Sequence, residues 1–320
     1  MYQTQELSNL VNGVDQESIE YARYWHGYLV FLRPFLLLFD YSTMQILSAI
    51  IFGILTVIMC YLIYRKINIF VAIAFIMSLF TADVFTAGVS LNAITPFYIA
   101  VIASIVLLWR FNKIKDKFMI FFIIGSVTAY LDLLTTPLVT LGIPITLYFL
   151  LSQKQQEMST KEIIIKLIKI SLAWGLGYAL TTTIKWFIVD VLYGREVVIN
   201  SIQEFFYRTG NTLEESKFVM IGATLIKNFN LMGKSTLYIM LISISILLVL
   251  LTKFQTKEAR KTKLWIYGII ALMPLLWYTV LLNHSVVHAF FTYRNIILII
   301  INIQVLVILY VQNLIAKKGE

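Results

Sequence analysis

Long runs of apolar residues, separated by short polar stretches, make up most of the chain. A membrane-spanning helix needs about 20 predominantly apolar residues, and fewer where its ends lie below the membrane surface. The pattern therefore predicts an all-α fold, a polytopic integral membrane helical bundle of about nine transmembrane helices in a domain covering residues 43–320. We expect these helices at 43–64, 68–83, 93–109, 118–134, 137–152, 165–190, 235–252, 264–282 and 295–314.

Two amphipathic stretches lie outside these runs. Residues 16–39 combine aromatic residues, two arginines and an apolar face, which is typical of a helix lying in the membrane interface, here broken near Pro34. Residues 199–210 predict a second, shorter interfacial helix within an outer loop that covers 191–234. We therefore expect residues 1–42 to form an extracytoplasmic loop that contains the first interfacial helix.

The four predicted helices between residues 68 and 152 are short. Each has about 16 or 17 apolar residues, or roughly 25 Å of helix, against a hydrocarbon core about 30 Å thick. The turns 81–92 and 131–137 at their outer ends are polar, so we expect these turns below the membrane surface. Polar turns at this depth, covered by interfacial helices, predict a cavity that opens outward at the level of the lipid headgroups.

Composition indicates that lipid is the solvent for most of the chain, because 59% of its residues are hydrophobic and only 13% are charged. An ordinary soluble domain has about 25% charged residues. The net charge of +9 comes from short basic clusters between apolar runs rather than from one continuous face, so nucleic-acid binding is not expected. The single cysteine, Cys60, lies inside an apolar run and excludes a disulfide framework.

The basic clusters indicate which side of the membrane each loop faces, because cytoplasmic loops retain positive charge. Most of the 26 basic residues lie in or beside every second connection between the predicted helices, or after the last one. They are Arg65, Lys66, Arg110, Lys113, Lys115, Lys117, Lys154, Lys161, Lys166, Lys169, Lys253, Lys257, Arg260, Lys261, Lys263, Lys317 and Lys318. The pattern predicts a multi-pass protein of the cell membrane with a cytoplasmic C-terminus.

This orientation puts residues 1–42 outside without a signal peptide before them. The simplest explanation is one further helix upstream of residue 1, which would give ten helices in the full protein. A nine-helix chain with its N-terminus outside is the alternative.

Ionisable residues at membrane depth are costly and are functional candidates for that reason. Asp83 and Asp132 lie in the two polar turns, where partial burial raises the pKa of a carboxyl toward the range of a general base. We therefore take Asp83 and Asp132 as the candidate catalytic residues. The structural alternative for each is a helix-end cap or an ion pair with Lys185 or Arg294.

Cations and aromatic residues on the outer side are the candidates for binding a substrate. An arginine can hold a phosphate by a two-point contact, and aromatic rings can stack on a sugar. The candidate substrate-binding residues are Arg33, Lys185, Arg294, Tyr293, Trp25 and His26. Anchoring at the membrane interface is the structural alternative for the aromatic residues and for Lys185.

Several motifs of known chemistry are not found. The chain has no Gly-rich phosphate loop, no Asp-x-Asp pair and no nucleophile elbow, which disfavours ATP-driven chemistry and cytosolic sugar transfer. His284 and His288 are four residues apart and would share one helix face, but no third metal ligand is evident. We therefore predict no metal site and no cofactor, with a divalent cation as the disfavoured alternative.

Three segments carry a resemblance to a known family. They are YARYWHGYLVFLRPFLLLFDY at 21–41, DLLTTPLVTLGIP at 132–144 and HAFFTYRN at 288–295. Through them nearly the whole chain resembles a family of polytopic membrane proteins from low-GC Gram-positive bacteria, most of them uncharacterised. That family is distantly similar to the GT-C class of polyprenyl-phosphate-sugar-dependent glycosyltransferases. The resemblance implies a further helix and an acidic outer motif before residue 1. It also implies that Asp83 matches the second acidic position of some GT-C enzymes, with Asp15 in the remaining part of the first outer loop.

The resemblance and the predicted outer cavity together favour a membrane glycosyltransferase. Such an enzyme would move a sugar from a polyprenyl-phosphate donor to a cell-envelope acceptor on the outer face, with membrane lipids as its other partners. A transporter or flippase for a lipid-linked sugar or envelope precursor is the alternative, and a polar trail across the bilayer would favour it. A non-catalytic subunit for assembly or polymer export is a third, and whether this chain is itself an active enzyme stays open.

Overall fold

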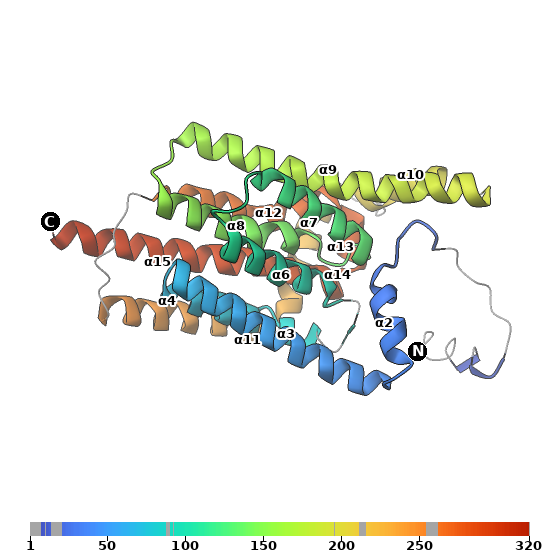
Figure 1. The fold of residues 1–320 in the computed structure, drawn as a ribbon, viewed down its shortest axis with the longest axis horizontal. Helices are drawn as coiled ribbons and strands as arrows, with labels where there is room; N and C mark the ends of the chain where they lie inside the picture. The colour runs from blue at the N-terminus through green and yellow to red at the C-terminus, as the bar shows by residue number, and fades with distance from the viewer. Residues whose placement is uncertain are drawn as a thin grey trace.

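The computed structural model describes residues 8–9, 11–13, 21–87, 90–91, 93–194, 196–210, 216–253 and 262–319. Within these ranges all regular secondary structure is helical. The long helices run along one direction in an elongated bundle, and the short helix α2 lies near one end of that bundle (Figure 1). The predicted all-α class is therefore confirmed for the described residues.

The observed helices match the predicted runs closely. Their bounds are α2 Tyr28–Leu36, α3 Tyr41–Lys66, α4 Ile69–Thr81, α5 Val84–Ala87, α6 Thr95–Arg110, α7 Lys117–Leu131, α8 Leu138–Gln155, α9 Thr160–Tyr193, α10 Val197–Thr209, α11 Lys217–Lys253, α12 Trp265–Val280, α13 Leu282–Val287, α14 Ala289–Thr292, the 3-10 helix η1 Tyr293–Ile296, and α15 Ile297–Gly319. Each predicted run falls within or near one of these helices, with most ends displaced by a few residues.

Fewer helices meet the length and composition expected of a membrane span than the nine that the sequence pattern predicts. In the described part of the chain three helices are long and apolar enough to cross a membrane: Tyr41–Lys66, Thr160–Tyr193 and Ala289–Ile315. A fourth span results if Lys217–Gly233 and Tyr238–Leu251, which meet at 72°, are counted as one. These helices support an integral membrane protein. The count of nine stays a prediction, because α4, α6, α7 and α12 are apolar but shorter than a bilayer core requires.

The predicted outer loop 191–234 is largely helical, which corrects the sequence prediction. α10 lies where a short interfacial helix is expected, but residues 217–233 form the first arm of α11. Gly233 has a φ of +73°, a left-handed conformation that glycine adopts without a steric penalty, and it lies at the bend between the two arms. The arm escaped prediction because Lys227 and Asn228 interrupt its apolar run, and both side chains are hydrogen-bonded to α13.

The predicted interfacial helix 16–39 is also shorter than expected. Helix α2 begins at Tyr28, passes through Pro34 and ends at Leu36, while residues 16–20 lie outside the described ranges. Residues 21–27 form a non-helical segment, called the strap below. The Gly27 N–H donates to Tyr130 O (2.9 Å) and the Trp25 ring N–H donates to Thr181 O (2.8 Å). The Gly27 bond takes a backbone N–H that a continuous helix would use, and the Trp25 side chain anchors the strap to α9.

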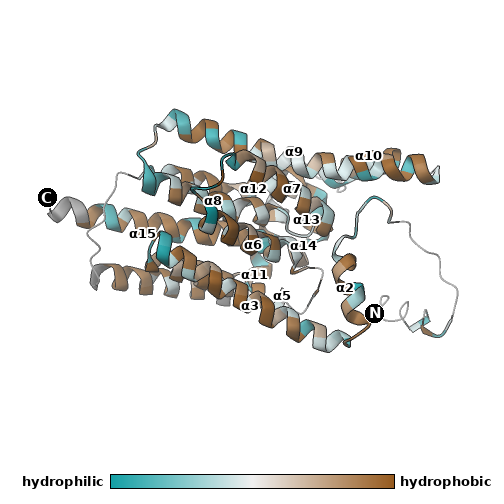
Figure 2. Ribbon diagram, viewed as in Figure 1, coloured by the Kyte–Doolittle hydropathy of each residue, from teal (hydrophilic) through white to brown (hydrophobic). Residues whose placement is uncertain are grey.

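The turns predicted to face the cytoplasm meet at one end of the bundle, called the basic end. There Lys154 Nζ donates to Ile67 O in the turn after α3 (2.8 Å), and the Gln155 amide donates to Asn112 in the turn after α6 (2.7 Å). Hydrophilic residues concentrate at these turns, whereas the flanks of the helices are largely hydrophobic (Figure 2). Residues 254–261 of the longest predicted cytoplasmic loop lie outside the described ranges. The predicted alternation of loops agrees with this arrangement, and the opposite end, where the strap lies, is called the strap end.

Helix α8 is the centre of the bundle. Every side chain from Leu138 to Gln153 is buried, so this helix is surrounded by other helices along almost its whole length. Because α8 begins directly after the polar turn 132–137, its position fixes that turn at the strap end.

Candidate functional site

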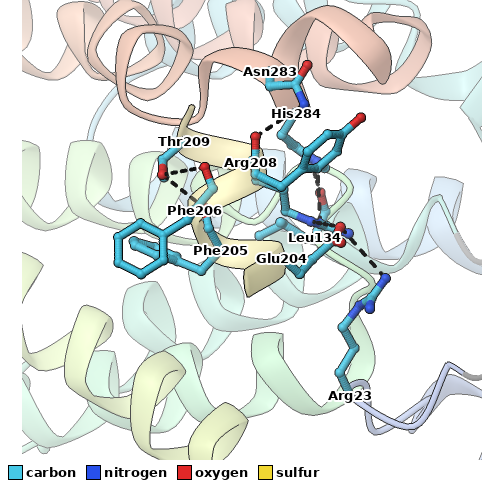
Figure 3. A network of polar contacts seen from close by, with 10 residues as sticks. Arg23, Leu134, Glu204, Phe205, Phe206, Arg208, Thr209, Asn283 and His284 are labelled. Carbon is cyan, nitrogen blue, oxygen red and sulfur yellow. Dashed lines mark hydrogen bonds and ion pairs between the residues drawn. The ribbon is translucent and has the colours of Figure 1, made fainter. Parts of the chain in front are cut away.

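A group of charged and polar residues, in part buried, lies at the strap end and is called the arginine centre. It consists of Arg23, Glu204, Arg208 and His284 with the backbone carbonyl of Leu134 (Figure 3). Arg208 Nε donates to Glu204 Oε1 (2.7 Å), and the second guanidinium, that of Arg23, lies 3.7 Å from the same oxygen. Arg208 is only 8% exposed. Four segments far apart in sequence therefore share one charged, largely buried network.

Local structure explains how α10 presents Arg208 to this network. Val197, Ser201 and Arg208 are its buried residues, and their spacing puts them on one helical face. Asp190 accepts hydrogen bonds from the Val197 and Val198 N–H groups (2.6 and 3.3 Å), which caps the start of the helix. The inner face of α10 thus carries the guanidinium toward α13, while its apolar outer face is exposed.

His284 holds Arg208 in place as a neutral imidazole. Its Nε2–H donates to Leu134 O (3.0 Å), so Nδ1 carries the lone pair that accepts from Arg208 Nη1 (3.4 Å). Burial, together with the positive charge of Arg208 and the neighbouring His288, lowers the pKa of His284 to about 3. Both ring nitrogens are therefore engaged. Across the described residues no group of three or more His, Cys, Asp or Glu side chains is arranged to hold a metal ion.

Asp132 lies in the turn between α7 and α8, the same turn that supplies the Leu134 carbonyl to the arginine centre. Its carboxyl accepts the Thr135 N–H (3.0 Å) and the Thr135 hydroxyl, and the side chain is 2% exposed. Burial raises the pKa of Asp132 to about 7, although the hydrogen bonds from its own turn oppose the shift. This geometry matches the cap expected as its structural alternative, because the carboxyl is directed into its own turn. Catalysis by Asp132 stays a prediction.

Asp83 is more accessible and lies in the turn between α4 and α5. It has a φ of +54°, its carboxylate accepts a hydrogen bond from the Thr86 hydroxyl, and its side chain is exposed. The Tyr293 hydroxyl lies close enough to this carboxylate to interact with its negative charge. The Arg294 guanidinium lies 4.7 Å from the centre of the Tyr293 ring. The structure therefore brings three of the predicted site residues together, a group called the acid turn; residues 88–89 and 92 of the predicted turn lie outside the described ranges.

The other predicted substrate-binding residues divide between two places. Lys185 Nζ lies 5.3 Å from the centre of the Trp25 ring, and His26 packs near Tyr21 and Tyr24 in the strap. Arg33 is exposed on α2 and is not brought together with them. The further acidic candidate, Asp15, lies outside the described ranges.

An apolar groove of about 660 Å³ runs between α2, α3, α6 and α7. Tyr28 and Leu131 line it at the strap end, and Val106 and Ile120, from the halves of α6 and α7 nearer the basic end, line it farther along. Its lining is almost entirely aliphatic and aromatic. The sequence predicts an outer cavity from polar turns, but it does not predict this groove, because the groove depends on how four helices pack.

Sequence reasoning missed Glu204 and Arg208. A signal was present, because their i,i+4 spacing places an acid and a base on one face of a predicted helix. The helix was predicted to lie in the membrane interface, so its charged side chains were expected to face water. In the structure the same face turns inward.

No protein family, no curated protein and no solved structure matches this chain. The similarity to GT-C glycosyltransferases therefore stays a prediction from the sequence. The function has to be argued from the groove, the acid turn and the arginine centre.

Proposed function

We propose that the protein is a membrane glycosyltransferase that moves a sugar from a polyprenyl-phosphate donor to a cell-envelope acceptor. The observation that carries this proposal is the apolar groove, which begins at the end of the bundle where the acids and arginines gather. A substrate with a long hydrocarbon chain and a charged headgroup matches both features, the apolar groove and the charged residues at its end. The chain would lie along the groove and the headgroup would remain at the strap end.

The acid turn supplies the chemistry that such a transfer needs. The acceptor hydroxyl oxygen attacks the anomeric carbon of the sugar while its proton moves to the Asp83 carboxylate. The bond from the anomeric carbon to the phosphate oxygen breaks, and its electron pair leaves with the polyprenyl phosphate. A guanidinium at the strap end stabilises that charge. Asp83 suits the role of base because it is exposed to an acceptor arriving from solution.

The positive charge of the basic end supports an orientation. Cytoplasmic loops retain Lys and Arg, so we place the basic end and the C-terminus in the cytoplasm of a cell-membrane protein. The strap end then faces outward, where cell-envelope acceptors are found.

The test uses a deletion strain of the source organism complemented with variants of the full chain. We expect Asp83→Asn to lower transfer of one sugar to the cell envelope about 100-fold or more, since a general base contributes about that much. The polyprenyl-phosphate sugar should accumulate, as measured by mass spectrometry of glycans and lipid extracts. Asp40→Asn is the matched control, because Asp40 is an exposed helix cap that asparagine can replace. Unchanged glycans with Asp83→Asn, in protein that reaches the membrane, would refute the proposed base.

A transporter or flippase is the second candidate, and buried polar residues along α15 favour it. Asn302 accepts from the Thr146 hydroxyl (3.1 Å), and Gln304 donates to the Ser243 hydroxyl (2.8 Å). All four side chains are wholly buried. Such contacts also join helices to one another without any transport. Two results of the complementation experiment together would favour the transporter. The deletion strain would retain lipid-linked sugar on the inner leaflet, and Asp83→Asn would restore the glycans as well as the unaltered chain does.

A further inference from the structure

We propose that the arginine centre is an anion site that binds a phosphate group through Arg208 and Arg23. The inference rests on the proposed function, because it identifies where the phosphate of a lipid-linked substrate is held. The sequence assigned that role to Arg33, Lys185 or Arg294 instead.

The charges within the centre do not balance. Two guanidinium groups share a single carboxylate, that of Glu204, and the imidazole of His284 is neutral. One positive charge is therefore left over next to a largely buried arginine. A buried cation without a full counter-charge is costly, and an anion bound at this place would remove that cost.

Three hydrogen-bond donors close to the centre have no partner in the described part of the chain. Arg23 Nε, Ser201 Oγ and Thr136 Oγ1 are buried and have no hydrogen-bond partner among the described residues. They come from the strap, from the inner face of α10 and from the turn 132–137, which are segments that form the centre. Buried donors are normally paired. A phosphate offers several strong acceptor oxygens and can accept from more than one of them.

Arg208 is held in a fixed orientation. Glu204 fixes its Nε and His284 fixes its Nη1, while the centre of the Tyr24 ring lies 5.8 Å from its guanidinium carbon. A guanidinium held in a fixed orientation is suited to the two-point contact that a phosphate makes.

The position of the centre next to the groove indicates the source of the phosphate. The strap leads from Arg23 directly into Tyr28, and Leu131 directly precedes Asp132, and both Tyr28 and Leu131 line the groove. A lipid whose chain occupies the groove would therefore carry its phosphate toward the arginine centre. We assign the site to the phosphate of such a lipid, with free phosphate as the other source of the same chemistry.

The experiment measures binding to the full chain in lipid nanodiscs with three probes: polyprenyl monophosphate, the uncharged polyprenol and inorganic phosphate. We expect polyprenyl monophosphate to bind about 10-fold to 100-fold more tightly than polyprenol, from the usual strength of hydrogen bonds to charged groups. Arg208→Gln and Arg23→Gln should each remove about 10-fold of that preference. Arg110→Gln is the matched control, because Arg110 lies at the end of α6, beside the turn that forms the basic end.

The outcomes separate the alternatives. If inorganic phosphate displaces polyprenyl monophosphate and binds with equal affinity, the anion site is supported and its ligand is free phosphate. Equal affinity for polyprenol and polyprenyl monophosphate would overturn the proposal, as would unchanged binding in both arginine variants. Arg23 is partly exposed in the strap, so Arg23→Gln tests the site even where Arg208→Gln fails to fold. The two proposals can also fail separately. If polyprenyl monophosphate binds as expected while the deletion strain keeps unchanged envelope glycans, the anion site is supported and the glycosyltransferase is refuted.

Discussion

Among the described residues, three other than glycine adopt a left-handed backbone conformation, and all three lie at the strap end. His26, Asp83 and Leu134 have φ values of +52°, +54° and +62°. Side chains with a Cβ adopt this region at a cost, and such residues persist only where their surroundings hold them. Asp83 is bonded to Thr86, and the Leu134 carbonyl accepts from His284. This clustering supports a functional site at the strap end.

The sequence alone indicated candidate site residues that lie in the turns near the predicted membrane surface. The acid turn brings Asp83, Tyr293 and Arg294 together. Asp83 and Arg294 were chosen because charged residues at this depth are rare, and Tyr293 because an aromatic ring can stack on a sugar. Arg208 could not be found in the same way. Its role depends on which face of α10 turns inward, and that is decided by packing against α13.

Asp132 should make stability depend on pH. Its pKa rises from 3.8 to about 7 on folding, so folding favours the protonated carboxyl. The folded state is therefore most stable below about pH 4 with respect to this group, and it loses up to about 4 kcal/mol as the pH rises to about 7. We expect the melting temperature of detergent-solubilised protein to fall over this range more steeply than that of Asp132→Asn, which keeps the oxygen that accepts from Thr135. Parallel curves for the two proteins would contradict this account.

At the scale of elements, α7 and α9 cross with their backbones in close contact. A Cβ added at Gly125 would lie 2.0 Å from Trp174 O, and one added at Gly177 would lie 2.1 Å from Phe122 O. The Ser126 hydroxyl also donates to Gly177 O (3.2 Å). Small residues that allow two backbones to approach are the usual basis of helix association in membranes. These two glycines therefore hold α9 against the helix that ends at the site.

Substituting these glycines should destabilise the crossing. Because the atoms that a new Cβ would meet belong to the backbone, the helices must move apart, and we expect Gly125→Ala and Gly177→Ala each to cost about 1 to 3 kcal/mol. The matched control is Gly175→Ala in the same helix, where nothing lies within 4 Å of the added Cβ. That variant should be neutral or up to about 1 kcal/mol more stable, since alanine favours helix. Melting temperatures in detergent measure both effects, and equal losses at all three positions would argue against the close crossing.

The helices were mostly predictable because each is a continuous apolar run, and helix ends follow from the polar residues between runs. The exceptions have physical causes. The first arm of α11 carries Lys227 and Asn228, whose side chains bond to α13, so polar residues there do not mark a loop. The strap is not helical because its donors bond to α7 and α9. Contacts between segments far apart in sequence leave no periodic signal.

At the scale of the whole molecule, the two ends of the bundle have different chemistry. The basic end joins the turns after α3, α6 and α8 through hydrogen bonds that satisfy their own polar groups. The strap end instead holds left-handed residues, buried donors without partners and the start of the apolar groove. A protein whose strain and unsatisfied polar groups gather at one end is organised to act at that end.

The orientation of the two ends should be measurable with single cysteines in a Cys60→Ser background. Lys115→Cys places a thiol in the exposed turn after α6 at the basic end, and Asn200→Cys places one on the exposed side of α10 at the strap end. Since positive loops stay in the cytoplasm, we expect a membrane-impermeant maleimide to label Asn200→Cys in intact cells, and Lys115→Cys only after permeabilisation. The reverse pattern would put the arginine centre and the acid turn in the cytoplasm. A polyprenyl-phosphate donor would then have to be used on the inner leaflet, and transfer to acceptors on the outer face would be excluded.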